Sequence, residues 1–218
     1  MNLEFTEMAN NIKKPLKTVL FVLIFGFVLY NSVYFKSLED FRSEVKVKEF
    51  DAAGYSLDFI ENRRETISAI PVEKFLDSLN SNFKGYVPTG KKLGISHNYY
   101  FMVAGSGIVE SISEENISVI LSNDRKIDIA TGFIYGNAVR EASEMAKIGD
   151  FQNTMDFNTI SIELNKLIRS EVVKPVKSDV KQGNVLQFKG ALKINDRNPD
   201  YGKLRIIPIM LNTKKNKN

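Results

Sequence analysis

An uncharged run of 18 residues near the start of the chain, "TVLFVLIFGFVLYNSVYF" at positions 18–35, limits what this chain can fold into more than any other feature. As a helix rising about 1.5 Å per residue, the run reaches about 27 Å, close to the ~30 Å hydrocarbon core of a bilayer. Lysines precede it (Lys13, Lys14 and Lys17) and tyrosines lie near its far end, which is typical of a membrane span with a cytoplasmic N-terminus. The sequence therefore predicts a transmembrane anchor over 18–35, with the rest of the chain outside the cytoplasm.

Three other fates of this run fit the residues less well. A cleaved signal peptide has an apolar region of about 7 to 15 residues and ends in small residues, whereas bulky side chains such as Tyr34 and Phe35 end this run. A buried core helix is disfavoured because a segment that is apolar on all sides and flanked by lysines suits lipid better. A lipid attached to cysteine is excluded because the sequence contains no cysteine, so the expected tether is the peptide itself.

The net positive charge of the chain comes from its two ends. The formal net charge is +4, but residues 1–17 contribute +1 and the lysines at 214, 215 and 217 contribute +3, so residues 18–213 are neutral overall. A neutral body lacks the positive surface that nucleic-acid binding needs, and no nucleic-acid partner is expected. The lack of cysteine also excludes thiolate metal sites and cysteine nucleophiles.

Length and composition predict one sizeable domain behind the anchor. A chain of 218 residues with 43% hydrophobic and 26% charged residues is ordinary for a globular protein with its own core. The expected organisation is a cytoplasmic N-terminus over 1–17, the anchor over 18–35, a charge-dense stalk over 36–50, an extracytoplasmic α+β domain over 51–213, and a basic tail over 214–218.

Two helices are expected at the start of the α+β domain, over 51–80. Apolar residues recur at helical spacing on both sides of Pro71, which can begin a second helix because the first turn needs no N–H at that position. We expect the two helices to form a pair whose apolar faces are core. These faces consist of Tyr55, Phe59, Ile60, Ile67 and Ile70 before the proline, and Val72, Phe75, Leu76 and Leu79 after it.

Beyond Leu79 the pattern changes from helix to strand. Strands bounded by turn-forming residues are indicated by "NYYFMVAGSGIVESI", "ISVIL", "KIDIATGFIY", "NVLQFKGALKI" and "KLRIIPIMLN". Glycines at 105 and 107 predict a bulge or a bend in the first strand. A helix is expected between the third and fourth strands, with Asn158 or Thr159 as its N-cap and Pro175 limiting its end.

This order of three strands, a helix and two strands is that of the OB-fold, a five-stranded Greek-key barrel. The predicted fold class is α+β: an N-terminal transmembrane helix, a short helical pair, and a five-stranded OB-like β-barrel over 95–212 with a helix between strands three and four. Other small α+β sheets share this order of elements, so the order favours the barrel without requiring it.

Familiar catalytic patterns are incomplete in this sequence. The segment "GYVPTGKK" at 85–92 has the spacing of a phosphate-binding loop, but Lys92 replaces the Ser or Thr that binds magnesium. His97 is the single histidine, with no second histidine or cysteine to complete a zinc site. No serine lies in a Gly-x-Ser-x-Gly elbow. We therefore expect no enzyme activity, no metal and no cofactor.

A polar constellation between the third and fourth strands is the candidate site. Short polar and charged side chains are interleaved there with Phe151, Met155 and Phe157. Such a segment either bonds its own backbone in a long connection or lines a polar pocket, for example one for a sugar. The candidate binding residues are Asn137, Arg140, Glu141, Asp150, Asn153, Asp156, Asn158 and Asn165.

Hydrolysis of an envelope glycan is the catalytic alternative for which the sequence offers residues. A glycosidase needs two carboxyl groups about 5 to 9.5 Å apart in a cleft. The candidates for such a pair are Glu141, Glu144, Asp150 and Asp156.

Several runs across the chain resemble one bacterial family. The runs "IATGFIYGNAVREAS", "GDFQNTMDFNTISIELNKLI", "EVVKPVK" and "GNVLQFKGALKIN" are similar to predicted periplasmic lipoproteins that share a domain of unknown function. The similarity extends from about Phe50 to Leu211. The resemblance implies an exported, membrane-tethered domain with an OB-like barrel, often encoded beside sugar importers of the ATP-binding-cassette type, and with no established activity. This chain departs from the lipoprotein pattern because it has no cysteine to acylate.

The residues and the resemblance together predict a single-pass protein of the inner (cytoplasmic) membrane with an extracytoplasmic, periplasmic C-terminal domain. Its expected function is that of a non-enzymatic accessory or binding domain. The expected partners are the membrane, a sugar-importer component or solute-binding protein, and a small solute.

Overall fold

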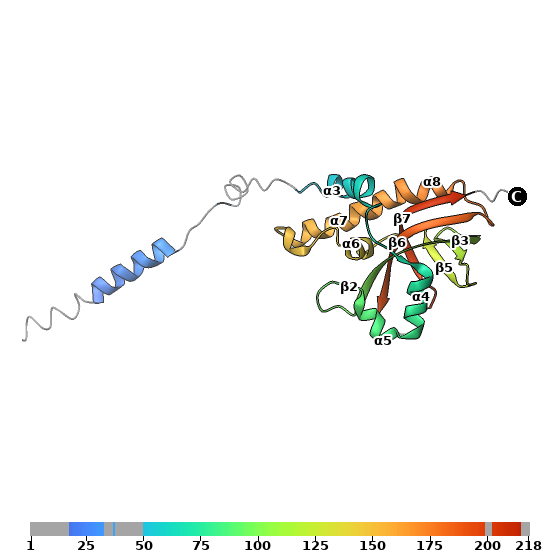
Figure 1. Ribbon diagram of the computed structural model, residues 1–218. Coiled ribbons are helices and arrows are strands. Elements are labelled where there is room, and N and C mark those ends of the chain that lie inside the picture. Colours follow the sequence, from blue (N-terminus) through green and yellow to red (C-terminus); the bar gives the residue numbers. More distant parts are fainter. Residues whose placement is uncertain (1–17, 33–36, 38–49, 199–201, 215–218) are drawn as a thin grey trace, which may run out of the picture. The chain divides into compact units, whose positions relative to one another are not determined.

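The computed structural model describes residues 18–32, 37, 50–198 and 202–214 of a chain that divides into two compact units, Met1–Glu49 and Phe50–Asn218 (Figure 1). Residues 18–32 form a helix with exposed side chains. Within the described residues, no helix has both the length and the hydropathy that a membrane crossing requires. The predicted N-terminus over 1–17, the last three positions of the predicted anchor, and most of the predicted stalk and basic tail lie outside the described residues.

Five strands close into a barrel in the second unit (Figure 1). Neighbouring strands pair in the order β3–β4–β5–β7–β6, and β6 pairs again with β3, so none of the five has a free edge. The β5–β7 pair is parallel and the other pairs are antiparallel. This arrangement confirms the predicted α+β class and the OB-like barrel. The strands are β3 (Asn98–Ile112), β4 (Asn116–Ile120), β5 (Lys126–Ala130), β6 (Val185–Asn195) and β7 (Arg205–Lys214).

Two glycines of the barrel allow close backbone approach, and one of them, Gly190, also lies at a register shift between β6 and β7. A Cβ atom on Gly107 would lie 2.5 Å from the backbone O of Ile120, on the neighbouring strand. A Cβ atom on Gly190 would lie 2.4 Å from the backbone O of another neighbour, Ile207. The expected irregularity in β3 is present, but it falls just after the glycines, between Val109 and Ser111.

The connection between β5 and β6 holds the expected helix and several shorter ones. The main helix, α7 (Thr154–Leu167), begins after Asn153, whose Oδ1 accepts the N–H of Asp156 at 2.8 Å. The predicted cap at Asn158 or Thr159 is therefore wrong, because an earlier cap starts the helix. The shorter elements are α6 (Ala138–Ser143), η3 (Ile148–Asp150), η4 (Ile168–Val173) and α8 (Lys174–Lys177).

The helical run that starts with α7 continues past Pro175, so the predicted limit is also wrong. Helix α7 leads into the π-helical turn η4 and then into α8. Pro175 falls in the first turn of α8, directly after the π-helical turn η4, so the helical backbone passes through it.

The two helices predicted over 51–80 are present, but they have different packing partners. Helix α3 (Ala52–Asp58), continued by η1 (Phe59–Arg63), packs mainly against α7. Helix α4 (Val72–Ser81) packs mainly against β3 and α5 (Phe83–Tyr86). Both helices bury apolar residues as expected, since Phe59 and Phe75 are fully buried. The predicted first face was too long, because the helical run ends at Arg63 and leaves Ile67 and Ile70 half-buried outside it. The short elements β1 (Ile70–Pro71), η2 (Val87–Thr89) and β2 (Lys91–Lys92) complete this part of the domain.

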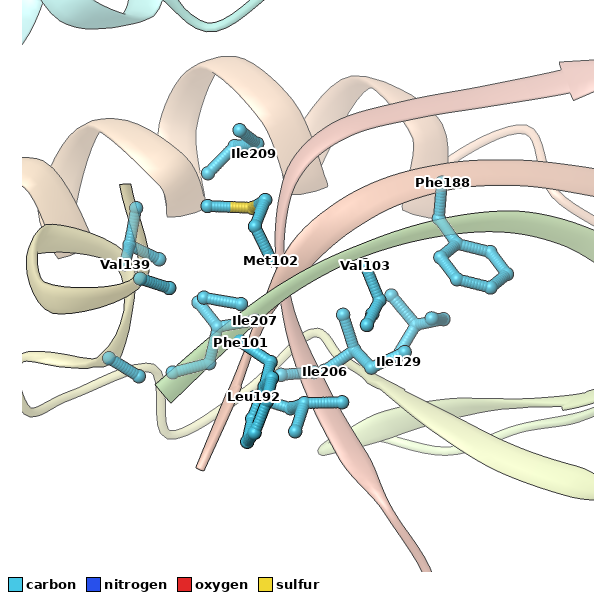
Figure 2. Packing of buried hydrophobic residues seen from close by; sticks show 14 of the residues in the cluster. Phe101, Met102, Val103, Ile129, Val139, Phe188, Leu192, Ile206, Ile207 and Ile209 are labelled. Atoms are coloured by element: carbon cyan, nitrogen blue, oxygen red, sulfur yellow. The ribbon is translucent and has the colours of Figure 1, made fainter. Parts of the chain in front are cut away.

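The hydrophobic core fills the barrel and continues beneath the helices that cover it. Figure 2 shows Phe101 and Val103 of β3 close to Leu192 of β6 and to Ile206 of β7. Side chains alternate between the two faces of a strand, which predicts that Tyr99 or its neighbour points inward. Residues 99–103 are in fact buried at every position, because β3 is covered on both faces: Phe75 of α4 packs against the Phe101 ring, and Tyr100 on the other face bonds Asn137 at the start of α6.

Candidate functional site

The predicted polar constellation separates into two groups. One group lies where the start of α6 meets one side of α7, and it consists of Asn137, Arg140, Glu141, Asn158 and Asn165. The other group lies at the starts of η3 and α7 and consists of Asp150, Asn153 and Asp156. The sequence therefore identified a real cluster, but it included residues whose role is to start a helix.

Arg140 is a buried arginine that ties α6 to α7. Its side chain is 2% exposed, and its Nη2 and Nε donate to Oε1 of Glu141 at 2.7 and 3.0 Å. Its Nη1 donates to the backbone O of Phe157 at 2.6 Å and to Oδ1 of Asn158 at 3.4 Å. The guanidinium also lies 3.6 Å from the centre of the Phe157 ring. Most of its N–H groups are thus engaged within the protein, and Glu141 balances its charge.

A chain of hydrogen bonds continues from Glu141 to strand β3. Asn137 donates from Nδ2 to Oε1 of Glu141 at 3.5 Å, and its Oδ1 accepts the hydroxyl of Tyr100 at 3.0 Å. Burial raises the pKa of the Tyr100 phenol above its ordinary value and outweighs the bond to Asn137, which lowers that pKa. The phenol therefore stays a neutral donor, and it fixes the orientation of the Asn137 amide.

Two side chains of the helical run hold the segment 134–137 in place. Asn165 donates from Nδ2 to the backbone O of Gly136 at 2.8 Å, and Arg169 donates from Nη1 to the backbone O of Ile134 at 2.6 Å. Gly136 has a φ of 85°, a left-handed conformation that favours glycine. The segment therefore has a fixed path beside α7.

An open pocket of about 500 Å³ is formed by the segment 134–137 and the helical run. We call it the asparagine pocket. No Asp or Glu is present among the described residues that line it. Its polar side consists of Asn137, Arg140, Asn158, Ser161, Asn165 and Arg169, and its apolar side includes Leu93, Ile134, Tyr135 and Ile162.

Ser161 is a pocket residue that the sequence reasoning missed. It is 8% exposed, and its Oγ has no hydrogen-bond partner in the described structure. A serine inside a helix commonly donates to the carbonyl four residues earlier, as Ser143 does to Val139 at 2.7 Å. For Ser161 that carbonyl belongs to Phe157, which already accepts Arg140 in addition to the helical N–H. The Ser161 hydroxyl therefore has no hydrogen-bond partner, and its oxygen is buried within a residue that lines the pocket.

The sequence contains a pattern that indicates the polar side of this pocket. Asn158, Ser161, Asn165 and Arg169 follow one another at intervals of three or four residues, which places them on one face of a helix. The adjacent face carries the buried stripe that includes Ile160, Leu164 and Ile168. When a helix has both an apolar face and a stripe of short polar side chains, the stripe indicates the wall of a pocket rather than an ordinary solvent-exposed face.

The four carboxylates considered for glycan hydrolysis each have local partners. Glu141 pairs with Arg140, and Oε2 of Glu144 lies 2.6 Å from Nζ of Lys91. Asp150 accepts the N–H of Lys147, and Asp156 accepts the side-chain amide of Asn153. None of the four lines the asparagine pocket. The structure therefore brings no pair of these carboxylates to the pocket.

Metal and phosphate sites receive no support from the described residues. No group of three or more His, Asp or Glu side chains among them could hold a metal ion. Nδ1 of His97 lies 2.9 Å from Oδ1 of Asp196, at the barrel surface. The segment 85–92 forms the end of α5, the turn η2 and the short strand β2, so it does not connect a strand to a helix as a phosphate-binding loop does.

Comparisons with known proteins agree with this architecture. A crystallised OB-fold protein from Thermotoga maritima is similar to this chain, with a TM-score of 0.69 and 22% identity over 76% of this chain and 99% of that one. This likeness shows the fold. No curated protein matches the chain. The profile of the predicted periplasmic lipoprotein family DUF2291 matches residues 23–212, which is most of the sequence, and the chain therefore belongs to that family.

Proposed function

We propose that this chain is a membrane-anchored extracytoplasmic binding domain that holds a small polar solute in the asparagine pocket. The observation that carries the proposal is the buried, unpartnered hydroxyl of Ser161 on the wall of that pocket. Leaving a buried polar group without a partner costs about 1–3 kcal/mol. A rotation of the Ser161 side chain that turns this hydroxyl toward the pocket lets a solute bond it and remove the cost, which favours the bound state.

The other polar groups of the pocket are fixed before a solute arrives. Arg140 is held by Glu141 and by the backbone of Phe157, and Asn165 is held by the backbone of Gly136. Groups that are already ordered lose little conformational entropy on binding. The mixture of an apolar side with a few positioned amides is typical of small-molecule sites.

The composition of the pocket supports binding without chemistry. General acid or base catalysis needs a titratable group within reach of the substrate. The described lining contains amides, the Ser161 hydroxyl, the Tyr135 phenol and two arginines, with no carboxylate and no histidine. We therefore propose a binding domain in preference to a glycan hydrolase.

Family membership indicates an extracytoplasmic location for the domain. We further propose that the segment 18–35 is a single-pass anchor in the inner membrane, since it is uncharged and follows three lysines. The test is fractionation of cells that express the full chain. We expect it in the membrane pellet after an alkaline wash, with the domain cleaved by protease added from the extracytoplasmic side. Intact chain in the cytosolic fraction would contradict the anchor.

The proposed protein partner is a component of a sugar importer or a solute-binding protein. Support for this partner comes from the resemblance of the chain to a family that is often encoded beside sugar importers. Cross-linking in intact membranes, followed by purification of the full chain and identification of its neighbours, tests it directly. Recovery of neither class of protein would count against the association, and it would leave the solute pocket unaffected.

Solute binding is tested by thermal unfolding of the full chain in detergent micelles, with a panel of neutral sugars, sugar acids and amino acids. A solute at about 100 times its Kd adds about 2.7 kcal/mol to the free energy of unfolding. We expect at least one class to raise Tm, and we expect Ser161→Ala to reduce this rise. Ser170→Ala is the matched control, because Ser170 lies on the same helical run, donates to Lys166 and does not line the pocket.

Two results would contradict the binding function. One is a panel in which no class raises Tm. The other is a rise in Tm that Ser161→Ala and Ser170→Ala leave equally unchanged, because the solute would then bind elsewhere.

A further inference from the structure

We infer that the solute of the asparagine pocket is a sugar acid whose carboxylate pairs with Arg169. This inference rests on the proposed function and names the chemical class of the solute. It follows from the distribution of charge around the segment 134–137 and from the kinds of side chain that line the pocket.

Arg169 is the cation of the pocket whose charge is not balanced. Its side chain is exposed, and it donates from Nη1 to the backbone O of Ile134 at 2.6 Å. No ion pair joins it to a carboxylate of the described residues, whereas Arg140 is neutralised by Glu141. A guanidinium has five N–H donors in a planar fork that suits the two oxygens of a carboxylate. Arg169 therefore has donors and charge available for an anionic group.

A second pocket adds positive charge beside the first. It has a volume of about 280 Å³, and both pockets are lined by Tyr135, Gly136 and Asn137. Its basic residues are Lys193, Lys203 and Arg205, and again no Asp or Glu is present among the described residues of the lining.

Only one of these three cations is neutralised by a described carboxylate. Lys203 pairs with Asp128 at 2.8 Å. Arg205 donates to neutral oxygens, those of the Asn116 side chain and the Gly132 backbone. Because residues 18–213 are neutral overall, unbalanced cations around the segment 134–137 create a local positive region. Such a region attracts small anions and raises their local concentration.

The remaining lining residues suit the hydroxyl groups and the ring of a sugar. Asn137, Asn158 and Asn165 offer amide donors and acceptors, and Ser161 offers a free hydroxyl. Tyr135 is 74% exposed at the same pocket and presents a flat ring. A sugar ring has a C–H face that packs on such a surface and hydroxyl edges that bond amides. An aliphatic acid without hydroxyls would leave these amides unused.

Isothermal titration calorimetry on the full chain in detergent micelles tests the inference, with D-glucuronate and D-glucose as probes. The two sugars differ only at the carbon that is a carboxylate in one and a hydroxymethyl group in the other. We expect glucuronate to bind about tenfold more tightly or better, the size expected for hydrogen bonds to a charged group. We expect Arg169→Gln to abolish this preference and Arg169→Lys, which keeps the charge, to retain part of it.

The control variant is Lys174→Gln, which removes one positive charge from an exposed position of the same helical run outside the pocket. We expect it to keep the preference for glucuronate.

Equal binding of glucose and glucuronate would overturn the sugar-acid class while leaving solute binding intact. Persistence of the preference in Arg169→Gln would overturn the role of Arg169. Tighter binding of glucose 6-phosphate than of glucuronate would overturn the sugar-acid class and indicate that the anionic group of the solute is a phosphate. No binding of either probe, with no solute of the thermal panel raising Tm, would overturn both proposals.

Discussion

Removal of Arg140 is expected to be among the most damaging single substitutions in this domain. The Arg140→Ala variant leaves the Glu141 side chain, which is 10% exposed, as a charge without its partner. It also removes the 2.6 Å bond to the Phe157 backbone and the contact with the Phe157 ring. Breaking a buried ion pair by removing one member costs about 3–5 kcal/mol. Since a domain is typically stable by about 5–15 kcal/mol, this loss is a large part of the total.

Urea unfolding followed by circular dichroism measures this cost on the full chain. Arg125→Ala is the matched control, because Arg125 also pairs with one carboxylate at 2.6 Å, but its partner Asp77 is 68% exposed. Exposed pairs contribute about 0–1 kcal/mol. Adding Glu141→Gln to Arg140→Ala should recover part of the loss, since no unpaired charge then remains. A loss for Arg140→Ala as small as that for Arg125→Ala would refute the reasoning that burial makes this pair essential.

Three other predictions concern parts of the domain that position the pocket. Because the folded-state pKa of Tyr100 is raised, its stabilising contribution is full below the unfolded pKa of about 10 and is lost as pH rises through the folded value. The free energy of unfolding should therefore fall above about pH 10, and less steeply in Tyr100→Phe, as urea titrations at several pH values would show. Gly107→Ala should cost about 1–3 kcal/mol, because the new Cβ would lie 2.5 Å from the Ile120 backbone O, whereas Gly149→Ala meets nothing within 4 Å and should be near neutral in the same assay. Asn153→Ala should cost about 1 kcal/mol through loss of the α7 N-cap, with Gln152→Ala as the control, and an equal effect of both would contradict the capping role.

The barrel could be predicted because the sequence pattern of each strand is local and recurs along the chain. Apolar and β-branched residues between turn-forming ones indicated each strand. The order of the strands and the helix favoured the topology of the OB-fold. The predicted family membership is likewise confirmed. The packing of α3 and α4 could not be predicted, because apolar spacing shows that a face is buried without showing against what.

The helix limits were misjudged for identifiable reasons. Asn153 and Asn158 are both acceptable N-caps by residue type, and only the position of the chain before α7 decides between them. Pro175 ordinarily ends a helix, but here it falls where a new helical turn begins.

The candidate site was predicted in part. Asn137, Arg140, Glu141, Asn158 and Asn165 do converge, since they flank the segment that packs on α7. Ser161 was missed because its free hydroxyl depends on Arg140 occupying a carbonyl of another helix, a contact that sequence spacing does not reveal.

Chemical-shift mapping of the asparagine side chains tests the binding site most directly. The full chain is labelled with nitrogen-15 at asparagine, held in lipid nanodiscs and titrated with the solute that most raises Tm, while NMR spectra are recorded. We predict that the side-chain amide signals of Asn137, Asn158 and Asn165 shift together and saturate at one Kd, while that of Asn153, which caps α7, stays in place. Saturable shifts confined to other asparagines, with these three signals unmoved, would show that the solute binds elsewhere and would contradict the pocket.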